Sequence, residues 1–192
     1  MLDEPKATEC KRNAVNAFGT ATVFERRARR TRRLIRTITF LGVLGPALLG
    51  ALAGAYGLEW KYLPHVMFVA ALIGGGQFIL SLWALVWQWD GDLTYALEAT
   101  SINYRLASAY HSIIISDAGK QQVAQDLAAL DAEARARSQM DNQAGISDKE
   151  KRRGMRAALR HFEMKCVGCE QIPRSLKNTK CEVCGKFGIL NL

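Results

Sequence analysis

The feature that most constrains this chain is one long stretch almost without charge. Between residues 37 and 89 the only Asp, Glu, Lys or Arg residues are Glu59 and Lys61. The stretch contains two apolar runs, residues 38–57 and residues 63–87, separated by a short turn. About twenty residues of helix cross a hydrocarbon core of roughly 30 Å. The pattern therefore predicts a hairpin of two transmembrane helices.

The alternative interpretation is a pair of buried core helices in a soluble protein. The rest of the chain is too polar to cover two such helices on all sides, because nearly all of the charged residues lie outside the uncharged stretch. Aromatic residues also flank the two runs, as interfacial anchors do. These are Trp60 and Tyr62 at the turn, and Trp83, Trp87 and Trp89 at the other end. We therefore favour membrane insertion.

The distribution of basic residues predicts the orientation of the hairpin. Residues 1–36 hold ten Lys or Arg and four Asp or Glu, and seven arginines lie between Arg26 and Arg36. The turn contains one basic residue, Lys61. Cytoplasmic segments next to a span are enriched in Lys and Arg, so both termini should be cytoplasmic, at the bacterial inner membrane. The position of the arginines directly before an apolar run favours contact with anionic lipid over nucleic acid.

Helices are predicted on both sides of the hairpin. In residues 1–36, apolar residues recur at helical steps; these are Ala14, Phe18, Ala21, Phe24 and Ala28. A helix over 93–115 should place Leu93, Leu97, Tyr104 and Ala107 near one face, and a helix over 121–140 should bury Val123, Leu127, Leu130 and Ala134. Ser147 and Glu150 form a capping box that begins a third helix, to about Met164. The fold class is therefore mainly α.

The predicted domain organisation has four parts. Residues 1–36 form an Arg-rich cytoplasmic helix, residues 37–89 the transmembrane hairpin, residues 90–164 a cytoplasmic helical region, and residues 165–192 a small metal-binding ribbon. The last part has the most specific signal of the four, because its cysteines have a regular spacing. Four of the five cysteines of the chain fall within it, which favours a metal site in a reducing compartment over a disulfide framework.

The cysteines form two C-x-x-C pairs separated by eleven residues, Cys166 with Cys169 and Cys181 with Cys184. Each pair can wrap two thiolates around one metal, and two pairs supply the tetrahedral four-sulfur set that Zn²⁺ prefers. A closed set leaves no position for water, so the zinc should be structural; the alternatives are a redox pair or a chance spacing. We expect Gly168 and Gly185 to permit the tight backbone turns of the two pairs.

Two expectations follow from the small size of the ribbon. About 27 residues are too few for a core of their own, so metal binding should drive local folding and its loss should leave the hairpin inserted. The fifth cysteine, Cys10, is interpreted as a free cytoplasmic thiol and not as a further ligand. No phosphate loop, nucleophile elbow or paired-carboxylate arrangement is visible in the sequence. We therefore expect a protein that is not an enzyme.

The hairpin also contains small residues at helical spacing. Gly50 and Gly54 form G-x-x-x-G in the first run, and Ala70 with Gly74 repeats that spacing in the second. Small residues let helix backbones approach closely in lipid. The pattern predicts packing within one hairpin, association between chains, or both. Gln77 is the strongly polar residue deep in the second run, and it is interpreted either as an interhelical hydrogen bond or as a pore-lining group.

These features together resemble known bacterial proteins. The C-x₂-C-x₁₁-C-x₂-C tail after a two-span hairpin resembles a family found on mobile genetic elements and named for that spacing. The Arg-rich helix, the close-coupled hairpin and the trailing helices, over about residues 8–140, are similar to the SLATT domains. That resemblance implies a two-transmembrane effector of a nucleotide-signalling defence system that perforates the membrane.

The resemblance implies three kinds of partner: the lipid bilayer, further copies of the chain in a homo-oligomer, and a protein regulator on the cytoplasmic side. The alternative function is a membrane-tethered adaptor whose zinc ribbon binds protein or nucleic acid. The four Lys or Arg residues within residues 166–192 give nucleic acid only a modest electrostatic footprint.

Overall fold

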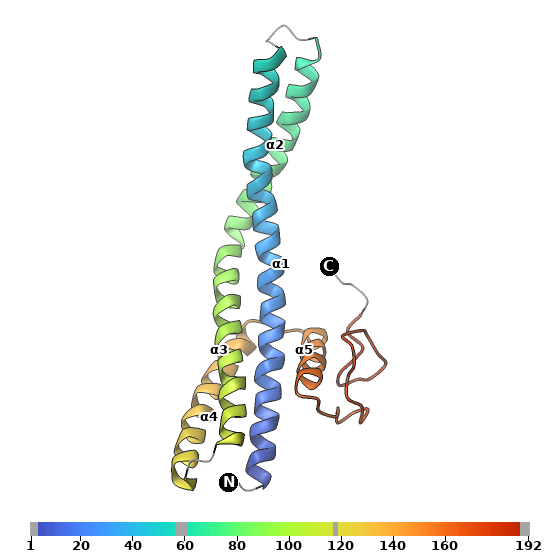
Figure 1. The fold of residues 1–192 in the computed structure, drawn as a ribbon. Coiled ribbons are helices and arrows are strands. Elements are labelled where there is room, and N and C mark those ends of the chain that lie inside the picture. Colours follow the sequence, from blue (N-terminus) through green and yellow to red (C-terminus); the bar gives the residue numbers. More distant parts are fainter. Residues whose placement is uncertain (1–3, 57–60, 117–118, 189–192) are drawn as a thin grey trace. The chain divides into compact units, whose positions relative to one another are not determined.

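The computed structural model describes residues 4–56, 61–116 and 119–188, and the part of the chain it describes is all-helical with an irregular C-terminal segment. Residues 57–60 lie outside the described part of the chain. They include the end of the first predicted run and the predicted anchor Trp60. The helices are α1 (Glu4–Tyr56), α2 (Leu63–Val86), α3 (Trp89–Ile115), α4 (Lys120–Gln143) and α5 (Asp148–His161) (Figure 1).

The chain divides into two compact units. One comprises Met1–Arg26 with Ala96–Leu192, and the other comprises Arg27–Tyr95. We call them the helix–ribbon unit and the hairpin unit. Helix α1 contributes residues to both, because it continues without a break through the arginine-rich stretch and the first apolar run.

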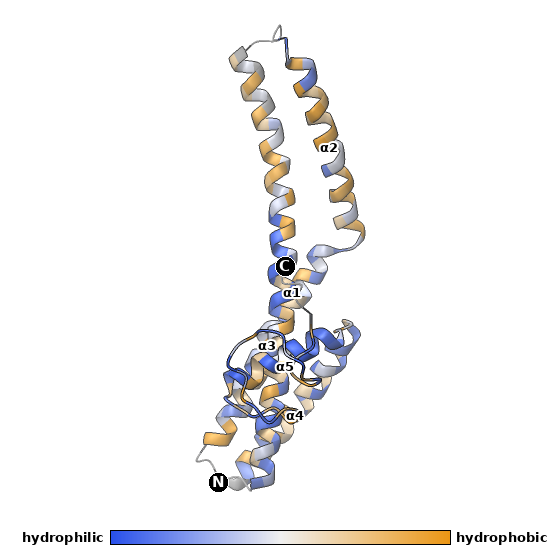
Figure 2. Ribbon diagram, turned by 90° about the vertical axis from the view of Figure 1, so that its right-hand side faces the viewer, coloured by the Kyte–Doolittle hydropathy of each residue, from blue (hydrophilic) through white to orange (hydrophobic). Residues whose placement is uncertain are grey.

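The hairpin unit contains two helices that are long and apolar enough to cross a membrane. Helix α2 begins and ends within one residue of the predicted run, and its second residue, Pro64, fits the first helical turn, where no amide donor is needed. No described residue of α2 is buried, and Leu85 and Val86 are 74% and 76% exposed. Apolar residues follow one another along α2 and the second half of α1 (Figure 2). Helices of a soluble core would be covered, so this exposure argues against the soluble alternative.

The helix–ribbon unit has a conventional core around the first half of α1. The predicted inner face of that helix is confirmed, since Ala14, Ala21 and Phe24 are each at most 2% exposed. The predicted face of α3 is wrong in part, because Leu97 is 48% exposed. The buried residues of α3 are instead Ala96, Ala99, Asn103, Leu106, Ala107 and Tyr110. Three of these six residues are alanines, whose small side chains allow α3 to pack closely on its neighbours.

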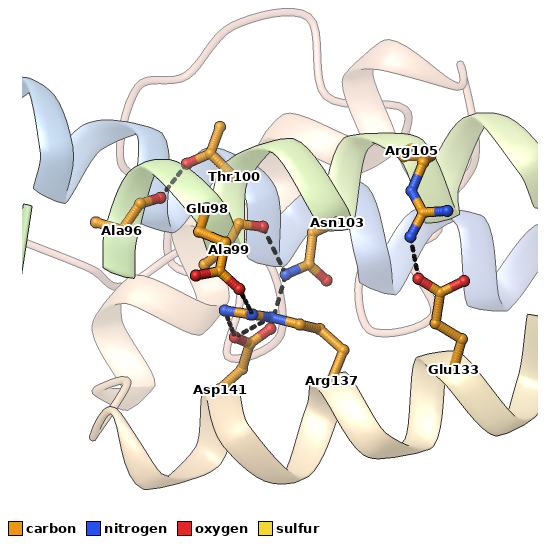
Figure 3. A network of polar contacts seen from close by, with 9 residues as sticks. All are labelled: Ala96, Glu98, Ala99, Thr100, Asn103, Arg105, Glu133, Arg137 and Asp141. Carbon is orange, nitrogen blue, oxygen red and sulfur yellow. Dashed lines mark hydrogen bonds and ion pairs between the residues drawn. The ribbon is translucent and has the colours of Figure 1, made fainter. Parts of the chain in front are cut away.

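A polar network joins α3 to α4 (Figure 3). Arg137 donates from Nε to Asp141 at 2.9 Å, and Asn103 donates to the other carboxylate oxygen at 2.7 Å. Arg137 also lies 3.4 Å from Glu98. Asn103, Arg137 and Asp141 are buried, so the charges of Arg137 and Asp141 balance each other at a site that water does not solvate. An exposed pair, Arg105 with Glu133, lies further along the same two helices.

Helices α4 and α5 agree with the sequence prediction. Val123 of α4 is buried, and Leu127, Leu130 and Ala134 are half-buried. The capping box of α5 is present, since the amide of Glu150 donates to Ser147 Oγ and the amide of Ser147 donates to the Glu150 carboxylate. Both bonds satisfy amides that the first helical turn leaves free. Helix α5 ends at His161, three residues earlier than predicted.

Candidate metal centre

The four cysteines of the tail converge on one point. Their sulfur atoms all lie within 4.8 Å of one another, and the Cys166–Cys181 and Cys169–Cys184 pairs are each 3.9 Å apart. A tetrahedral metal with sulfur bonds of about 2.3 Å would hold its sulfurs about 3.8 Å apart. A disulfide would need about 2.05 Å. The geometry therefore fits one metal ion shared by four thiolates.

The two C-x-x-C pairs have the same local structure. The amide of Glu170 donates to the carbonyl of Cys166 at 2.7 Å, and the amide of Gly185 donates to the carbonyl of Cys181 at 2.9 Å. In the first pair, the amide of Gly168 also points at Cys166 Sγ, at 3.4 Å. Each pair is thus a turn that presents two sulfurs on one side. Between residues 162 and 188, all of which the structure describes, the backbone forms turns and no regular strand.

The reason for glycine in these turns differs from the predicted one. Gly168 and Gly185 do not adopt positive φ, which occurs instead at Glu170 and Lys186. A Cβ atom on Gly168 would lie 2.7 Å from Val183 Cγ2, and one on Gly185 would overlap Thr179. The predicted need for glycine is therefore real, but its cause is lack of space and not backbone conformation.

The surroundings affect the two thiols of the second pair in opposite directions. Hydrogen bonds from the backbone amides of Cys184 and Val183 lower the pKa of the Cys181 thiol to about 7. Burial raises the pKa of the Cys184 thiol to about 12. A cation at the centre of the four sulfurs would favour the thiolate form of both, because a coordinating thiol is deprotonated outright.

The surroundings of Cys10 are those of an apolar core and not those of a metal ligand. It is fully buried beside Ala14 and Tyr110, and burial raises the pKa of its thiol. It is not part of the four-cysteine group. The prediction that Cys10 is no further ligand is consistent with this position. The cysteine behaves as a small apolar core residue and not as a solvated thiol.

The sequence interpretation missed three arginines of α5. Arg156 donates from Nε to the carbonyl of Ser175 at 2.7 Å and points Nη1 at Cys184 Sγ, 3.6 Å away. Arg152 donates to the carbonyl of Lys186, and Arg153 lies over the ring of Phe187. A cluster of arginines before the first cysteine is a visible signal. A solvated helix face has the same composition, so the pattern alone does not distinguish arginines that contact the ribbon from arginines that face water.

The four-cysteine cluster also shares a core with two of the helices. Cys166 and Cys184 are buried with Val15 of α1 and with Ala158 and Leu159 of α5. The ribbon is therefore packed on the helix–ribbon unit and is not an independent tail. The sequence analysis did not anticipate this packing, because the apolar partners, which are scattered along α1 and α5, come together only in three dimensions.

The polar and small residues of the hairpin separate into two groups. Gln77 of α2 donates to the carbonyl of Ile38 of α1 at 3.1 Å, which agrees with the interhelical hydrogen bond. Gly42 leaves the space that the Gln77 amide occupies. A Cβ atom on Gly50, Gly54, Gly74 or Gly75 would meet no atom within 4 Å, so within the described hairpin these glycines face open space.

The fold and site together define a helical protein with two helices apolar enough to cross a membrane and a C-terminal four-cysteine centre. The chain belongs to the mobilome CxxCx(11)CxxC protein family, whose model matches residues 7–187. Comparison with curated proteins and comparison with solved structures each gave no match. Membership therefore covers nearly the whole chain, helices and cysteines together.

Proposed function

We propose that the chain is an inner-membrane protein in which α2 and the second half of α1 span the bilayer. One observation carries the proposal: the apolar side chains of these helices are uncovered over the full length of α2. Exposure of such an apolar surface to water is unfavourable, whereas lipid tails would cover it. The arginines before the first span and the single Lys61 in the turn support cytoplasmic termini on a bacterial inner membrane.

The metal of the cysteine centre is, in this proposal, one structural Zn²⁺. Sulfur spacings of 3.9 Å support a tetrahedral ion, and four thiolates are the ligand set of structural zinc. Since all four positions around the ion would be taken by protein, no substrate or water could bind there. This donor set supports a role in folding or docking and a chain that is not an enzyme.

The function of the hairpin, we infer, is that of an effector that oligomerises and opens or perturbs the membrane in a mobile-element or antiphage defence system. The similarity to SLATT domains suggests this role. The glycines that face open space support it, because small residues at G-x-x-x-G spacing favour close contact between helices in lipid. The partners are then the bilayer, further copies of the chain, and a protein regulator that acts on the cytoplasmic unit.

Inducible expression in a bacterial host tests the effector role. We expect wild-type protein to depolarise the cells, as read by a potential-sensitive dye, and to form crosslinked oligomers. Gly54→Leu should reduce both, because a bulky side chain would separate the contacting backbones. Gly76→Leu is the matched control, since it adds the same apolar surface outside the two small-residue stripes and also meets no atom within the hairpin.

The two variants separate packing from simple insertion. If toxicity came from hydrophobic insertion alone, both leucines would preserve or increase it, since each strengthens insertion. A wild-type chain that neither self-associates nor depolarises cells, even with its neighbouring genes co-expressed, would overturn the effector proposal.

A second candidate function is a membrane-tethered adaptor, and the surface of the ribbon favours it. Val167 at the first turn is 90% exposed, and Ile172 and Leu176 are also exposed. Lys165, Arg174 and Lys180 line a cavity of about 800 Å³ beside the cysteines. Exposed apolar and basic side chains together suit an acidic protein partner. An adaptor would leave expressing cells healthy, and Val167→Asp would abolish capture of its partner.

A further inference from the structure

The charge of Arg156 has no obvious counterpart. Its side chain is buried, at 7% exposure, and it contacts the carbonyls of Ser175 and Cys184, the hydroxyl of Thr179 and the sulfur of Cys184. Within the described residues, no carboxylate pairs with this guanidinium. Carbonyl and hydroxyl groups satisfy its hydrogen bonds but carry no net charge. A buried cation without an anion is strongly unfavourable.

A metal-loaded cysteine centre supplies the missing anion. Four thiolates around one Zn²⁺ carry a net charge of about −2. Cys184 Sγ lies 3.6 Å from Arg156 Nη1, which is within reach of an N–H···S hydrogen bond. Groups that hydrogen-bond to metal ligands orient them and raise the affinity for the metal. The guanidinium is therefore in the right place to balance the centre.

The same helix contacts α1 at a point two residues earlier. A Cβ atom on Gly154 would lie 2.5 Å from the carbonyl oxygen of Gly19 and 2.9 Å from Val23 Cγ2. The backbones of α5 and α1 thus touch at Gly154 and Gly19. Helix α5 therefore holds the cysteine centre through Arg156 and holds α1 through Gly154, and all of these residues belong to the helix–ribbon unit.

We propose that Arg156 is a positioning residue that balances the charge of the metal-loaded cysteine centre, so that metal occupancy determines how firmly α5 packs on α1. The inference rests on the zinc centre proposed above and is independent of the membrane role. The metal would then stabilise the packing of α5 on α1 as well as the fold of the ribbon. Loss of the ion would leave a buried guanidinium without an anion, and the cost would fall on the packing of α5.

The first experiment measures zinc affinity of the full-length chain in detergent by competition with a chromophoric chelator. We expect Arg156→Gln to weaken zinc binding about 10–100-fold. Arg156→Lys should lie between that variant and wild type, because it keeps the charge and loses the planar fork. Arg160→Gln is the control, since it removes an exposed arginine of the same helix and should leave the affinity unchanged. Equal affinities for wild type and Arg156→Gln would overturn the proposal.

The second experiment uses wild-type protein alone, and so it decides the question even if Arg156→Gln does not fold. Hydrogen exchange of α5 amides and of α1 near Gly19 is measured with zinc bound and after chelation. We expect chelation to increase exchange in both segments. Increased exchange confined to residues 165–188, with α5 still protected, would contradict the coupling. A wild-type chain without any zinc would overturn the zinc centre itself, which is a distinct failure.

Discussion

Glycine has opposite roles in the two units. In the helix–ribbon unit, Gly19 and Gly154 let two helices touch, and a Cβ on Gly154 would meet backbone at 2.5 Å. In the hairpin unit, a Cβ on Gly50 or Gly54 would meet no atom within 4 Å. The first pair is explained by contacts inside the chain. The second is not, so its small size is available for a neighbour that the single chain lacks.

The polar groups follow the same division. The helix–ribbon unit buries the network of Asn103, Arg137 and Asp141, whose polar groups have partners within the chain. In the hairpin unit, the hydrogen bond from the Gln77 side chain to the carbonyl of Ile38 joins α2 to α1. The difference supports the proposal that the helix–ribbon unit lies in water and the hairpin unit in lipid. The variants below, taken from the largest expected effect to the smallest, test that division.

The largest effect should come from loss of the metal. Cys181→Ser removes one of four ligands and should abolish bound zinc. Structural zinc contributes on the order of 10 kcal/mol to the folding of small domains, so its loss should cost more stability than any other change considered below. Elemental analysis of purified protein should find about one zinc per wild-type chain and none in the variant. Cys10→Ser, at the buried cysteine outside the cluster, should keep its zinc. Full zinc in Cys181→Ser would refute the four-ligand assignment.

The next effect concerns the buried pair of Arg137 and Asp141. Arg137→Met should lower the free energy of unfolding of the helix–ribbon unit by about 3–5 kcal/mol, because it leaves Asp141 buried without its cation. Arg105→Met, at the exposed pair between the same helices, should cost about 0–1 kcal/mol. Denaturant unfolding followed by circular dichroism measures both. Similar losses for the two variants would show that burial does not set the strength of this network.

Glycine-to-alanine changes should have opposite signs in the two units. Gly154→Ala should destabilise the helix–ribbon unit by about 1–3 kcal/mol, because the added methyl group meets the backbone of Gly19. Gly50→Ala meets no atom, and alanine favours a helix over glycine by about 1 kcal/mol, so it should be neutral or stabilising. Thermal unfolding in detergent reads both. A stabilising Gly154→Ala would contradict the close contact of α1 and α5.

The smallest effect should come from Gln77. Gln77→Leu removes the hydrogen bond to Ile38 and should weaken the pairing of α1 with α2 by about 0.6 kcal/mol, a typical value for such bonds in membranes. Unfolding titrations in mixed micelles, with Ser81→Ala as the control on the same helix, measure the change. Altered ion leakage from vesicles with unchanged hairpin stability would instead favour a pore-lining role for Gln77.

The features that could be predicted from the sequence are those that leave a local signal. The apolar runs, the Ser147–Glu150 capping box and the two C-x-x-C pairs each depend on residues close together in the chain. Helix α2 follows its run to within one residue, and that run contains no charged residue. The convergence of the four cysteines follows from their spacing, since each pair already forms half of a tetrahedral site.

The features that could not be predicted depend on contacts between distant segments. Half of the buried residues of α3 are alanines, whose apolar signal is weaker than that of the exposed Leu97. In the sequence, Arg156 does not differ from the other arginines of a basic helix. Its burial depends on contacts with the distant carbonyls of Ser175 and Cys184. The shared core of ribbon and helices needs Val15 and Leu159, which are far apart in the chain, to meet around the cysteines.

The central claim is that the hairpin unit lies in a bilayer and the helix–ribbon unit in the cytoplasm. Topology reporters fused after Lys61 and at the C-terminus test it most directly, with alkaline phosphatase active only outside the inner membrane and a fluorescent protein active only inside. The account predicts an external Lys61 and a cytoplasmic C-terminus, from the same cells. Both reporters on one side of the membrane, or a chain that stays in the soluble fraction, would contradict it.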